Sequence, residues 1–259
     1  MNKNNVRWLA ILIAGVCLAG CVNHNQEKVD DSVCSEEAIG ETISIEAPDG
    51  NSYVNIQDTC MLRIYYPKYS RIDLICGKMP DKNEDSVIMT CAAAYTAKYL
   101  KDFDHMNIRG NHISGGKLYN GSSCNAYRGA FTFYDGDTHF AYDNWNEDYQ
   151  NAVSKGGCGF AQDMMIHHGG IVNHSRKDDD KDLFRALCMI DGKLAVIDSK
   201  EIISFGSFIR NLQNAGATEA IYLDMGGWKH SWYRDGNGKA IEIYPSPTPY
   251  GTNWITFYK

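Results

Sequence analysis

The stretch Arg185–Gly227, RALCMIDGKLAVIDSKEIISFGSFIRNLQNAGATEAIYLDMGG, determines the fold expected for this chain. It opens with two short apolar runs, Leu187–Ile190 and Leu194–Ile197, which are rich in β-forming residues. Asp191-Gly192 separates the two runs, and this dipeptide favours the two-residue turn of a tight hairpin. The pattern therefore predicts a β-hairpin.

A helix and a strand are expected after the hairpin. Large apolar residues recur at helical spacing and Gly216 follows as a stop, so one helix face is expected to be buried; the residues are Ile202, Ile203, Phe205, Phe208, Ile209 and Leu212. Ala220–Leu223 then predicts a short buried strand that ends at Asp224.

Asp224 is the first candidate for chemistry. An acid at the end of a buried strand, close to Gly226 and Gly227, lies where the backbone allows a ligand to approach and where the carboxylate is partly desolvated. The alternative is that Asp224 caps a turn or accepts hydrogen bonds from nearby amides, as Asp does in most loops. Spacing alone favours this alternative.

The order of these features resembles the phosphodiester glycosidase family. The resemblance rests on the Arg-led hairpin, the Asp-Gly turn, a helix start at Ser204-Phe205, the helix end Ala215-Gly216-Ala217, and Leu223-Asp224 before glycines. It covers about the last third of the chain and extends weakly to the segments Cys91–Tyr95, Gly115-Gly116 and Phe160–Gln162. The family implies hydrolysis of a sugar-1-phosphodiester.

The chain departs from the family pattern in two places. Leu223–Trp228 reads LDMGGW where family members usually carry Leu-Asp-Gly-Gly-Gly-Ser-Ser. Ala92–Tyr95 reads AAAY where they usually carry Asn-Ala-Gly-Phe-Phe. An alternative function therefore stays open, a non-catalytic glycan-binding surface lipoprotein on the same fold, because fold alone does not determine activity. A purely structural envelope protein is a third possibility.

The resemblance also implies roles for individual residues. Near the anomeric carbon, Asp224 would stabilise a developing sugar cation or position water, and Arg185 would hold the departing phosphate with two hydrogen bonds. Gln162 and Tyr95 occupy matching motif positions near the site. Gly226, Gly227 and the aromatic Trp228 complete the expected substrate-binding set, together with His112 as considered next. No cofactor is expected.

His112 lies in the glycine-rich segment Arg109–Gly116, RGNHISGG. Three glycines and two hydrogen-bonding side chains allow such a loop to wrap around a polar ligand. A structural histidine with its hydrogen bonds satisfied is an equally good explanation.

The N-terminal residues have the pattern of a bacterial lipoprotein signal. Lys3 and Arg7 precede an apolar run that ends at Leu18-Ala19-Gly20-Cys21, and the run is too short to span a membrane as a helix. The pattern predicts cleavage before Cys21, lipidation of its thiol and anchoring in the bacterial cell envelope. The expected organisation is a signal peptide at 1–20, a polar tether at 21–41 and one domain at 42–259. An ordinary cleaved secretory signal is the alternative.

The charge balance bears on the partner. The full chain has 25 basic and 32 acidic residues, and loss of residues 1–20 removes only Lys3 and Arg7, which gives a net charge of −9. An acidic surface without a basic stripe repels a polyphosphate backbone, so nucleic acid is not expected as a partner. The expected partners are a sugar phosphate or glycan substrate and, through lipidated Cys21, the membrane.

Cysteines and histidines suggest no metal site. Seven cysteines follow Cys21, no Cys-x-x-Cys pair occurs, and one or two disulfides are expected in an exported chain. Cys76, Cys91 and Cys188 lie in apolar runs and are expected to be buried. His167 and His168 are adjacent, and neighbours in a strand point to opposite faces, so the two are not expected to share an ion even with His174 nearby.

Elsewhere β patterns dominate, and the one further helix is expected at Asn146–Val153. Strands are expected at Thr42–Ala47, Met61–Tyr66, Arg71–Cys76, Val87–Ala93, Ala130–Tyr134, His139–Tyr142 and Trp254–Tyr258. The fold class expected is α+β, a single domain built on a large mixed β-sheet with few helices.

Overall fold

A computed structural model describes residues 42–46, 52–97, 102–124, 126–224, 230–244 and 251–259. The chain divides into two units, residues 1–30 and 31–259, and all described residues belong to the second. The expected signal peptide and tether (1–41), the lipidation site Cys21, and Gly226, Gly227 and Trp228 lie outside the described residues. Within the described part, no helix has the length and apolarity needed to cross a membrane.

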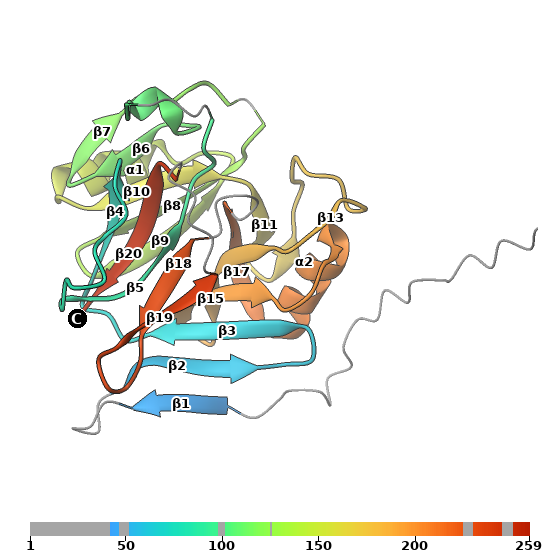
Figure 1. Ribbon diagram of the computed structural model, residues 1–259. Coiled ribbons are helices and arrows are strands. Elements are labelled where there is room, and N and C mark those ends of the chain that lie inside the picture. Colours follow the sequence, from blue (N-terminus) through green and yellow to red (C-terminus); the bar gives the residue numbers. More distant parts are fainter. Residues whose placement is uncertain (1–41, 47–51, 98–101, 125, 225–229, 245–250) are drawn as a thin grey trace, which may run out of the picture. The chain divides into compact units, whose positions relative to one another are not determined.

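Most of the described chain is β-structure, and the largest sheet has eight strands (Figure 1). Their order is β1 (Thr42–Glu46), β2 (Ser52–Asp58), β3 (Leu62–Pro67), β15 (Lys193–Ser199), β14 (Arg185–Ile190), β17 (Ala217–Leu223), β11 (Met164–His167) and β12 (Gly170–Ile171). Each neighbouring pair in this sheet is antiparallel.

Two five-stranded sheets and a short pair complete the β-structure of the described residues. One sheet has the order β19 (Ala240–Tyr244), β18 (Ser231–Arg234), β5 (Val87–Ala92), β20 (Asn253–Tyr258) and β4 (Arg71–Cys76). The other has the order β7 (Lys117–Tyr119), β6 (His112–Ser114), β10 (Cys158–Gln162), β8 (Gly129–Tyr134) and β9 (Asp137–Tyr142). The pair is β13 (Lys181–Asp182) with β16 (Ile203–Ser204). Helices are α1 (Asn146–Ser154), α2 (Phe205–Asn214) and the short 3₁₀ helix η2 (His105–Asn107).

The architecture is mostly β with two α-helices in the described residues, which is compatible with the expected α+β class. It differs from the expected single large mixed sheet, because several sheets are present and their described strand ladders are antiparallel. Short turns such as Asp135-Gly136 and Asp191-Gly192 join consecutive strands, and a parallel pair would require a long crossover instead.

The predicted hairpin is confirmed in β14 and β15. Ile190 pairs with Lys193, so the loop contains only Asp191 and Gly192. Both residues have positive φ, 48° and 70°, as a type I′ turn requires. The twist of this turn matches that of the strands, so a local dipeptide fixes the register of the central strands of the large sheet.

The predicted helix is also present, but it begins later than its apolar pattern. Ile203 belongs to β16, and Ile202 is 67% exposed. Ser204 has extended backbone angles and its Oγ accepts a hydrogen bond from the Ser207 amide, so it caps α2 and the helix starts at Phe205. After the helix, Gly216 adopts φ +86°, as its position as a stop signal predicted.

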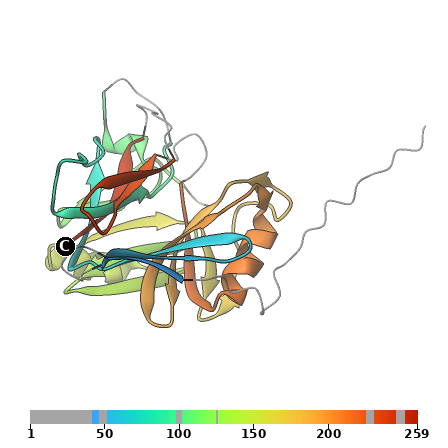
Figure 2. The same cartoon turned by 60° about the horizontal axis from the view of Figure 1, so that its bottom comes forward.

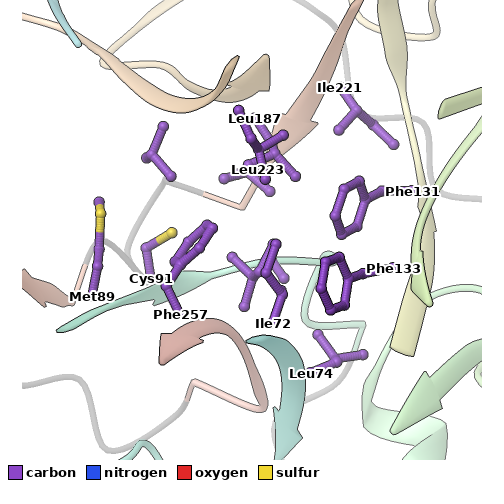
Figure 3. Packing of buried hydrophobic residues seen from close by; sticks show 14 of the residues in the cluster. Ile72, Leu74, Met89, Cys91, Phe131, Phe133, Leu187, Ile221, Leu223 and Phe257 are labelled. Carbon is purple, nitrogen blue, oxygen red and sulfur yellow. The ribbon is translucent and has the colours of Figure 1, made fainter. Parts of the chain in front are cut away.

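The large sheet is buried on both faces near its centre. Leu187, Ile221 and Leu223 point toward Phe131 and Phe133 of β8 (Figure 3). Alternate residues on the same strands, such as Cys188 and Tyr222, belong to a second apolar cluster, which α2 covers (orange in Figure 2). Burial on both faces explains why these strands read as continuous apolar runs.

Strand β20 lies between β4 and β5, in the interior of its sheet. It pairs with β5 from Trp254 to Tyr258, and the hydroxyls of Thr90 and Thr256 lie 2.9 Å apart although 166 residues separate them in the chain.

The expected disulfides are not found among the described residues. Six cysteines are described, and each is a free thiol. Cys91 and Cys188 are buried as predicted, whereas Cys76 is only partly buried. Cys91, Cys158 and Cys188 are fully buried, and this burial raises the pKa of each thiol.

Candidate functional site

Asp224 directly follows β17 and is only 4% exposed. Its amide donates to the Ala93 carbonyl at 2.8 Å, and its Oδ2 accepts a hydrogen bond from the Thr96 amide at 3.0 Å. Burial raises the pKa of Asp224 to about 7, and the Thr96 amide and the Arg176 charge offset part of this rise. The carboxyl therefore exchanges its proton near neutral pH, which suits general acid–base chemistry.

A second buried carboxyl, Asp163, lies between β10 and β11 and is 1% exposed. Both of its oxygens accept hydrogen bonds from the Ser175 amide, at 3.0 and 2.9 Å, and Oδ2 also accepts one from the Ser175 hydroxyl. The backbone carbonyl of Asp163 accepts a hydrogen bond from the Tyr222 amide at 2.9 Å. Tyr222 lies in β17, two residues before Asp224. Burial raises the pKa of Asp163, and the Ser175 hydrogen bonds oppose this rise.

Tyr95 and Arg176 join the two acids into one site. Arg176 Nη2 donates to the Tyr95 hydroxyl at 2.7 Å, and the guanidinium carbon lies 5.0 Å from the centre of the Tyr222 ring. Burial raises the pKa of Tyr95 to about 12, and the charges of Asp224 and Asp163 both contribute to this rise. The tyrosine is therefore within electrostatic reach of both carboxyls.

A cavity of about 290 Å³ opens beside this group. It is lined by Tyr95, Thr96, Arg109, Cys124, Ala126, Tyr127 and Ser175. The Tyr95 and Tyr127 rings lie 5.6 Å apart along its wall, and Arg109 supplies a cationic side chain. Three residues of the cavity lining contact the acids or respond to their charge: Thr96 donates to Asp224, Ser175 donates to Asp163, and Tyr95 feels both charges. The aromatic and cationic pocket therefore lies next to two buried carboxyls.

Arg185 does not face Asp224, contrary to the sequence-based expectation. It is fully buried and binds Asp198, its partner in the neighbouring strand, through Nε at 2.6 Å and Nη2 at 2.7 Å. Arg185 pairs with Leu223 across the sheet, so it lies on the sheet face of Leu223. Asp224 and its neighbours Tyr222 and Tyr95 lie on the α2 side, because side chains alternate along a strand.

Asp198 binds only two of the three nitrogens of the Arg185 guanidinium. Its Nη1 has no hydrogen-bond partner among the described residues. A cavity of about 270 Å³, lined in part by Asp198, Arg63 and Lys200, lies beside the ion pair. The cation that acts on Asp224 is Arg176 instead.

Of the other predicted site residues that the structure describes, Tyr95 and Gln162 lie at the site and His112 lies elsewhere. Tyr95 belongs to the site, and Gln162 immediately precedes Asp163 and is buried. The Gln162 Oε1 accepts from the Asp163 amide at 3.0 Å, and its Nε2 has no partner among the described residues. Gln162 therefore lies next to Asp163, within the candidate site.

His112 lies in a different cluster. Its Nε2 is 2.8 Å from His105 Nδ1, and its Nδ1 is 3.2 Å from the Gly110 carbonyl oxygen. Burial lowers the pKa of His112 to about 4, so the ring is neutral at pH 7. None of the contacts described for His112 involves Asp224, Tyr95 or Arg176.

The expectation that His167 and His168 lie in one strand and point to opposite faces is wrong. His167 ends β11, but His168 occupies the following turn with φ 51°, so the two are not alternating strand residues. Their rings lie 3.8 Å apart, and both Nδ1 atoms approach Glu219, at 2.8 and 3.1 Å. His174 instead contacts Asp178 and the Arg176 carbonyl.

A larger cavity, about 850 Å³, lies around the Asp191-Gly192 turn and is also lined by Tyr66, Tyr69 and Lys259. This turn is at the opposite end of β14 from Arg185 and therefore also from its partner Leu223. The cavity lining includes no buried carboxyl, so we place the candidate site at Asp163 and Asp224.

Sequence reasoning missed Asp163 and Arg176. Asp163 interrupts the apolar run from Cys158 to Ile166, and an acid within such a run is rarely buried without a specific partner or function. That signal was sufficient to find it. Arg176 lies in a strongly charged segment that reads as solvated surface, so its contact with Tyr95 follows only from the fold.

Comparison with known proteins gives a structural match. No protein-family model and no curated protein matches the sequence. Among solved structures, the catalytic domain of zebrafish N-acetylglucosamine-1-phosphodiester alpha-N-acetylglucosaminidase, auto-inhibited by its pro-peptide, is similar with a TM-score of 0.53 and 14% identity. The match covers 85% of this chain and 82% of that domain. A hypothetical protein from Synechocystis matches with a TM-score of 0.46 and 11% identity, covering 86% of this chain and 62% of that one. The described chain thus has a fold similar to that of the zebrafish catalytic domain.

Proposed function

We propose that this chain is a hydrolase that cleaves a glycosyl phosphodiester and releases the sugar. The observation that carries the proposal is Asp224, a buried carboxyl with a pKa of about 7 at the end of a strand beside an aromatic cavity. The fold similarity to a phosphodiester glycosaminidase domain supports the same reaction class.

The cavity suits a small substrate. At about 290 Å³ it lies just below the usual range for ligand pockets, roughly 300–1,000 Å³, so it fits one sugar with its phosphate better than a long glycan. Tyr95 and Tyr127 offer aromatic faces to a sugar ring, whose apolar face stacks on such side chains. Arg109 offers a guanidinium to the phosphate.

The reaction transfers the sugar to water. Asp224 in its ionised form takes a proton from a water molecule that attacks the anomeric carbon, while the bond from that carbon to the phosphate oxygen breaks. The phosphate leaves as a monoester that keeps the bonding electrons. Because a phosphate is a good leaving group, little proton donation to it is required.

Asp163 and the arginines support this step. A carboxylate at Asp163 stabilises positive charge that develops on the sugar ring, and Arg109 neutralises the phosphate. Arg176 holds the Tyr95 hydroxyl and offsets the raised pKa of Asp224. Arg109 and Arg176 therefore replace Arg185 in the cationic role, since Arg185 is committed to Asp198.

We further propose that the protein acts in the bacterial cell envelope, anchored through lipidated Cys21. The basic start, apolar run and Leu-Ala-Gly-Cys end of residues 1–21 support this location. The acidic net charge argues against nucleic acid as the partner.

A panel of sugar-1-phosphodiesters tests the activity. We expect sugar release from at least one member by the wild type, and a loss of about 100-fold or more in Asp224→Asn, as for removal of an acid–base group. Asp143→Asn changes an exposed acid that pairs with Arg128 and serves as the matched control with unchanged release.

The same panel separates the alternative functions. Sugar release that is equal in the wild type and Asp224→Asn contradicts the proposed mechanism. Binding of a sugar phosphate without release across the whole panel contradicts the enzymatic proposal and favours a glycan-binding protein.

A further inference from the structure

Three side chains with metal-binding atoms converge away from the candidate site. Cys76 ends β4, His105 lies in η2 and His112 begins β6. One ligand atom from each, a thiol sulfur and two imidazole nitrogens, lies within 4.8 Å of the others. His112 is fully buried, while Cys76 and His105 are partly buried, so the cluster opens toward solvent on one side.

The orientation of His112 resembles that of a metal ligand. Its Nδ1 donates to the Gly110 carbonyl at 3.2 Å, which leaves the lone pair of Nε2 directed at His105. Metal-binding histidines commonly donate their second nitrogen to a backbone carbonyl in this way, because the bond fixes the tautomer and the ring plane. The 2.8 Å contact then places the Nδ1 proton of His105 between the two rings.

The aromatic surroundings hold the second imidazole. The His105 ring stacks on Tyr119 with centroids 3.5 Å apart and planes 10° apart, and Phe103 packs against it edge-on at 5.2 Å. Asp104 caps η2 by accepting from the Met106 amide at 2.7 Å. These contacts fix His105 before any ligand arrives, which lowers the entropy cost of binding.

We propose that Cys76, His105 and His112 bind one transition-metal ion of the zinc class. The ion takes the place of the proton between the two imidazoles. That proton moves to Nε2 of His105 through solvent, so the ring stays neutral, and the Cys76 thiol releases its proton to water on binding. Tetrahedral zinc with Zn–N bonds of about 2.0–2.1 Å requires the two nitrogens to be about 3.3 Å apart, so the rings need to separate by roughly half an ångström. The sulfur needs to move toward the rings by about 1 Å at most.

The donor set selects the metal. Two imidazoles and a thiolate suit zinc, cobalt(II) or copper, and they suit calcium and magnesium poorly because those ions prefer oxygen. Three protein ligands leave a fourth position for water or a small anion, as in open zinc sites.

Occupancy would affect the neighbouring cavity. The ion joins β4 of one five-stranded sheet to β6 of the other, and η2 lies in the segment between Tyr95 and His112. The Arg109 amide donates to the Tyr95 carbonyl at 2.9 Å, and Thr96 forms an isolated antiparallel β-bridge with Ile108. Metal binding therefore holds η2 and β6 on either side of Ile108 and Arg109, the two residues that contact Thr96 and Tyr95 at the cavity.

Cobalt(II) titration of the purified, reduced chain tests the site. We expect a thiolate-to-cobalt charge-transfer band in the near ultraviolet and intense visible bands of tetrahedral cobalt, saturating at one ion per chain. Zinc should displace cobalt and abolish these bands, because it binds such sites more tightly. Cys76→Ser should lose the charge-transfer band, and His105→Ala should weaken binding by at least about tenfold.

Matched variants separate this cluster from the other histidine group. His167, His168 and Glu219 also converge but contain no thiol, so cobalt bound there gives no thiolate band. His168→Ala and Cys60→Ser, which changes an exposed thiol, should leave the spectrum unchanged. Circular dichroism of the metal-free variants checks that Cys76→Ser and His105→Ala fold.

Two results would overturn the proposal. One is a cobalt spectrum without a thiolate band in the folded wild type. The other is a thiolate band that persists in folded Cys76→Ser or disappears in Cys60→Ser.

Discussion

Asp224 and Arg185 are both buried and ionisable, but their surroundings have opposite effects on the charged form. Arg185 is neutralised by Asp198 through two hydrogen bonds. Asp224 has the Thr96 amide and the charge of Arg176, and burial still raises its pKa to about 7. The first arrangement favours the charged form, and the second disfavours it. Each makes a separate prediction about stability.

Replacing Asp224 by Asn should remove one contribution to the pH dependence of stability, the one that lowers stability as the pH rises. Between pH 3.8 and pH 7 the folded protein retains a proton on Asp224 that the unfolded chain releases, so the free energy of unfolding falls as the pH rises. Below this range the carboxyl is protonated in both states and the effect is absent. The rise in pKa corresponds to roughly 4 kcal/mol as an upper bound. Urea unfolding of wild type and Asp224→Asn at pH 4, 6 and 8 measures it.

The variant should gain stability over wild type on going from pH 4 to pH 8. Comparing the two proteins at each pH isolates Asp224, because Asp163 and the other acids titrate in both. A stability difference that stays constant from pH 4 to pH 8 would contradict the raised pKa.

Arg185→Met should destabilise the protein strongly. The change leaves Asp198, which is 2% exposed, as a buried carboxylate without its cation, and breaking a buried pair costs about 3–5 kcal/mol. Arg63→Met is the matched control, because the Arg63–Asp58 pair is partly exposed and contributes about 0–1 kcal/mol. Denaturant unfolding at pH 7 compares them. Equal losses in the two variants would show that Arg185 does not stabilise the sheet through Asp198.

Secondary-structure elements follow their local signals closely, and α2 illustrates the rule. Its apolar residues predicted the helix, but the start depends on Ser204, whose Oγ accepts from the Ser207 amide at 3.2 Å. Ile202 and Ile203 continue the helical spacing yet lie before the cap, since Ile203 pairs with Asp182 in a strand. Periodicity therefore predicts the element, and capping chemistry predicts its end.

Removal of this cap should cost about 1 kcal/mol. Ser204→Ala loses the acceptor for the Ser207 amide, whereas Ser204→Asp keeps one and should remain close to wild type. Thermal unfolding followed by circular dichroism measures both variants. Equal melting temperatures for wild type and Ser204→Ala would exclude a capping role for this hydroxyl.

Turns explain one success and one failure of prediction. Asp191-Gly192 is a strong hairpin dipeptide and gave the correct pairing of β14 with β15. His168-Gly169 also forms a two-residue turn, between β11 and β12, with φ values of 51° and 76°. His-Gly is not one of the usual hairpin dipeptides, such as Asn-Gly or Asp-Gly, so no turn was expected here and the two imidazoles were predicted to lie on opposite faces of a strand.

At the level of the whole chain, the candidate site depends on contacts that no local pattern contains. The strand before Asp224 was predictable, but its facing cation was not. Arg185 has the correct residue type and lies opposite Leu223, yet the alternation of side chains directs it to the other face of the sheet. Arg176 reaches Tyr95 across 81 residues of sequence. Long-range packing thus determines which arginine serves the site.

The burial of thiols across the fold predicts their reactivity. Alkylation of the folded protein should modify exposed Cys60 rapidly and leave Cys91, Cys158 and Cys188 unmodified until the protein is denatured. Peptide mass spectrometry assigns each site, and a sample denatured first provides full labelling. Finding bridged peptides among these four cysteines without denaturation would contradict the free thiols described here.

The position of β20 has a consequence for biosynthesis. This strand fills the interior of a sheet between β4 and β5, and its Thr256 meets Thr90 of β5. While a ribosome is still adding residues 93–252, the residues of β4 and β5 have been translated but those of β20, the strand that lies between them, have not. The sheet can therefore close only after nearly all of the described chain has been translated, and until then the edge of β5 that β20 will occupy has no partner, which makes it a site for unwanted strand pairing.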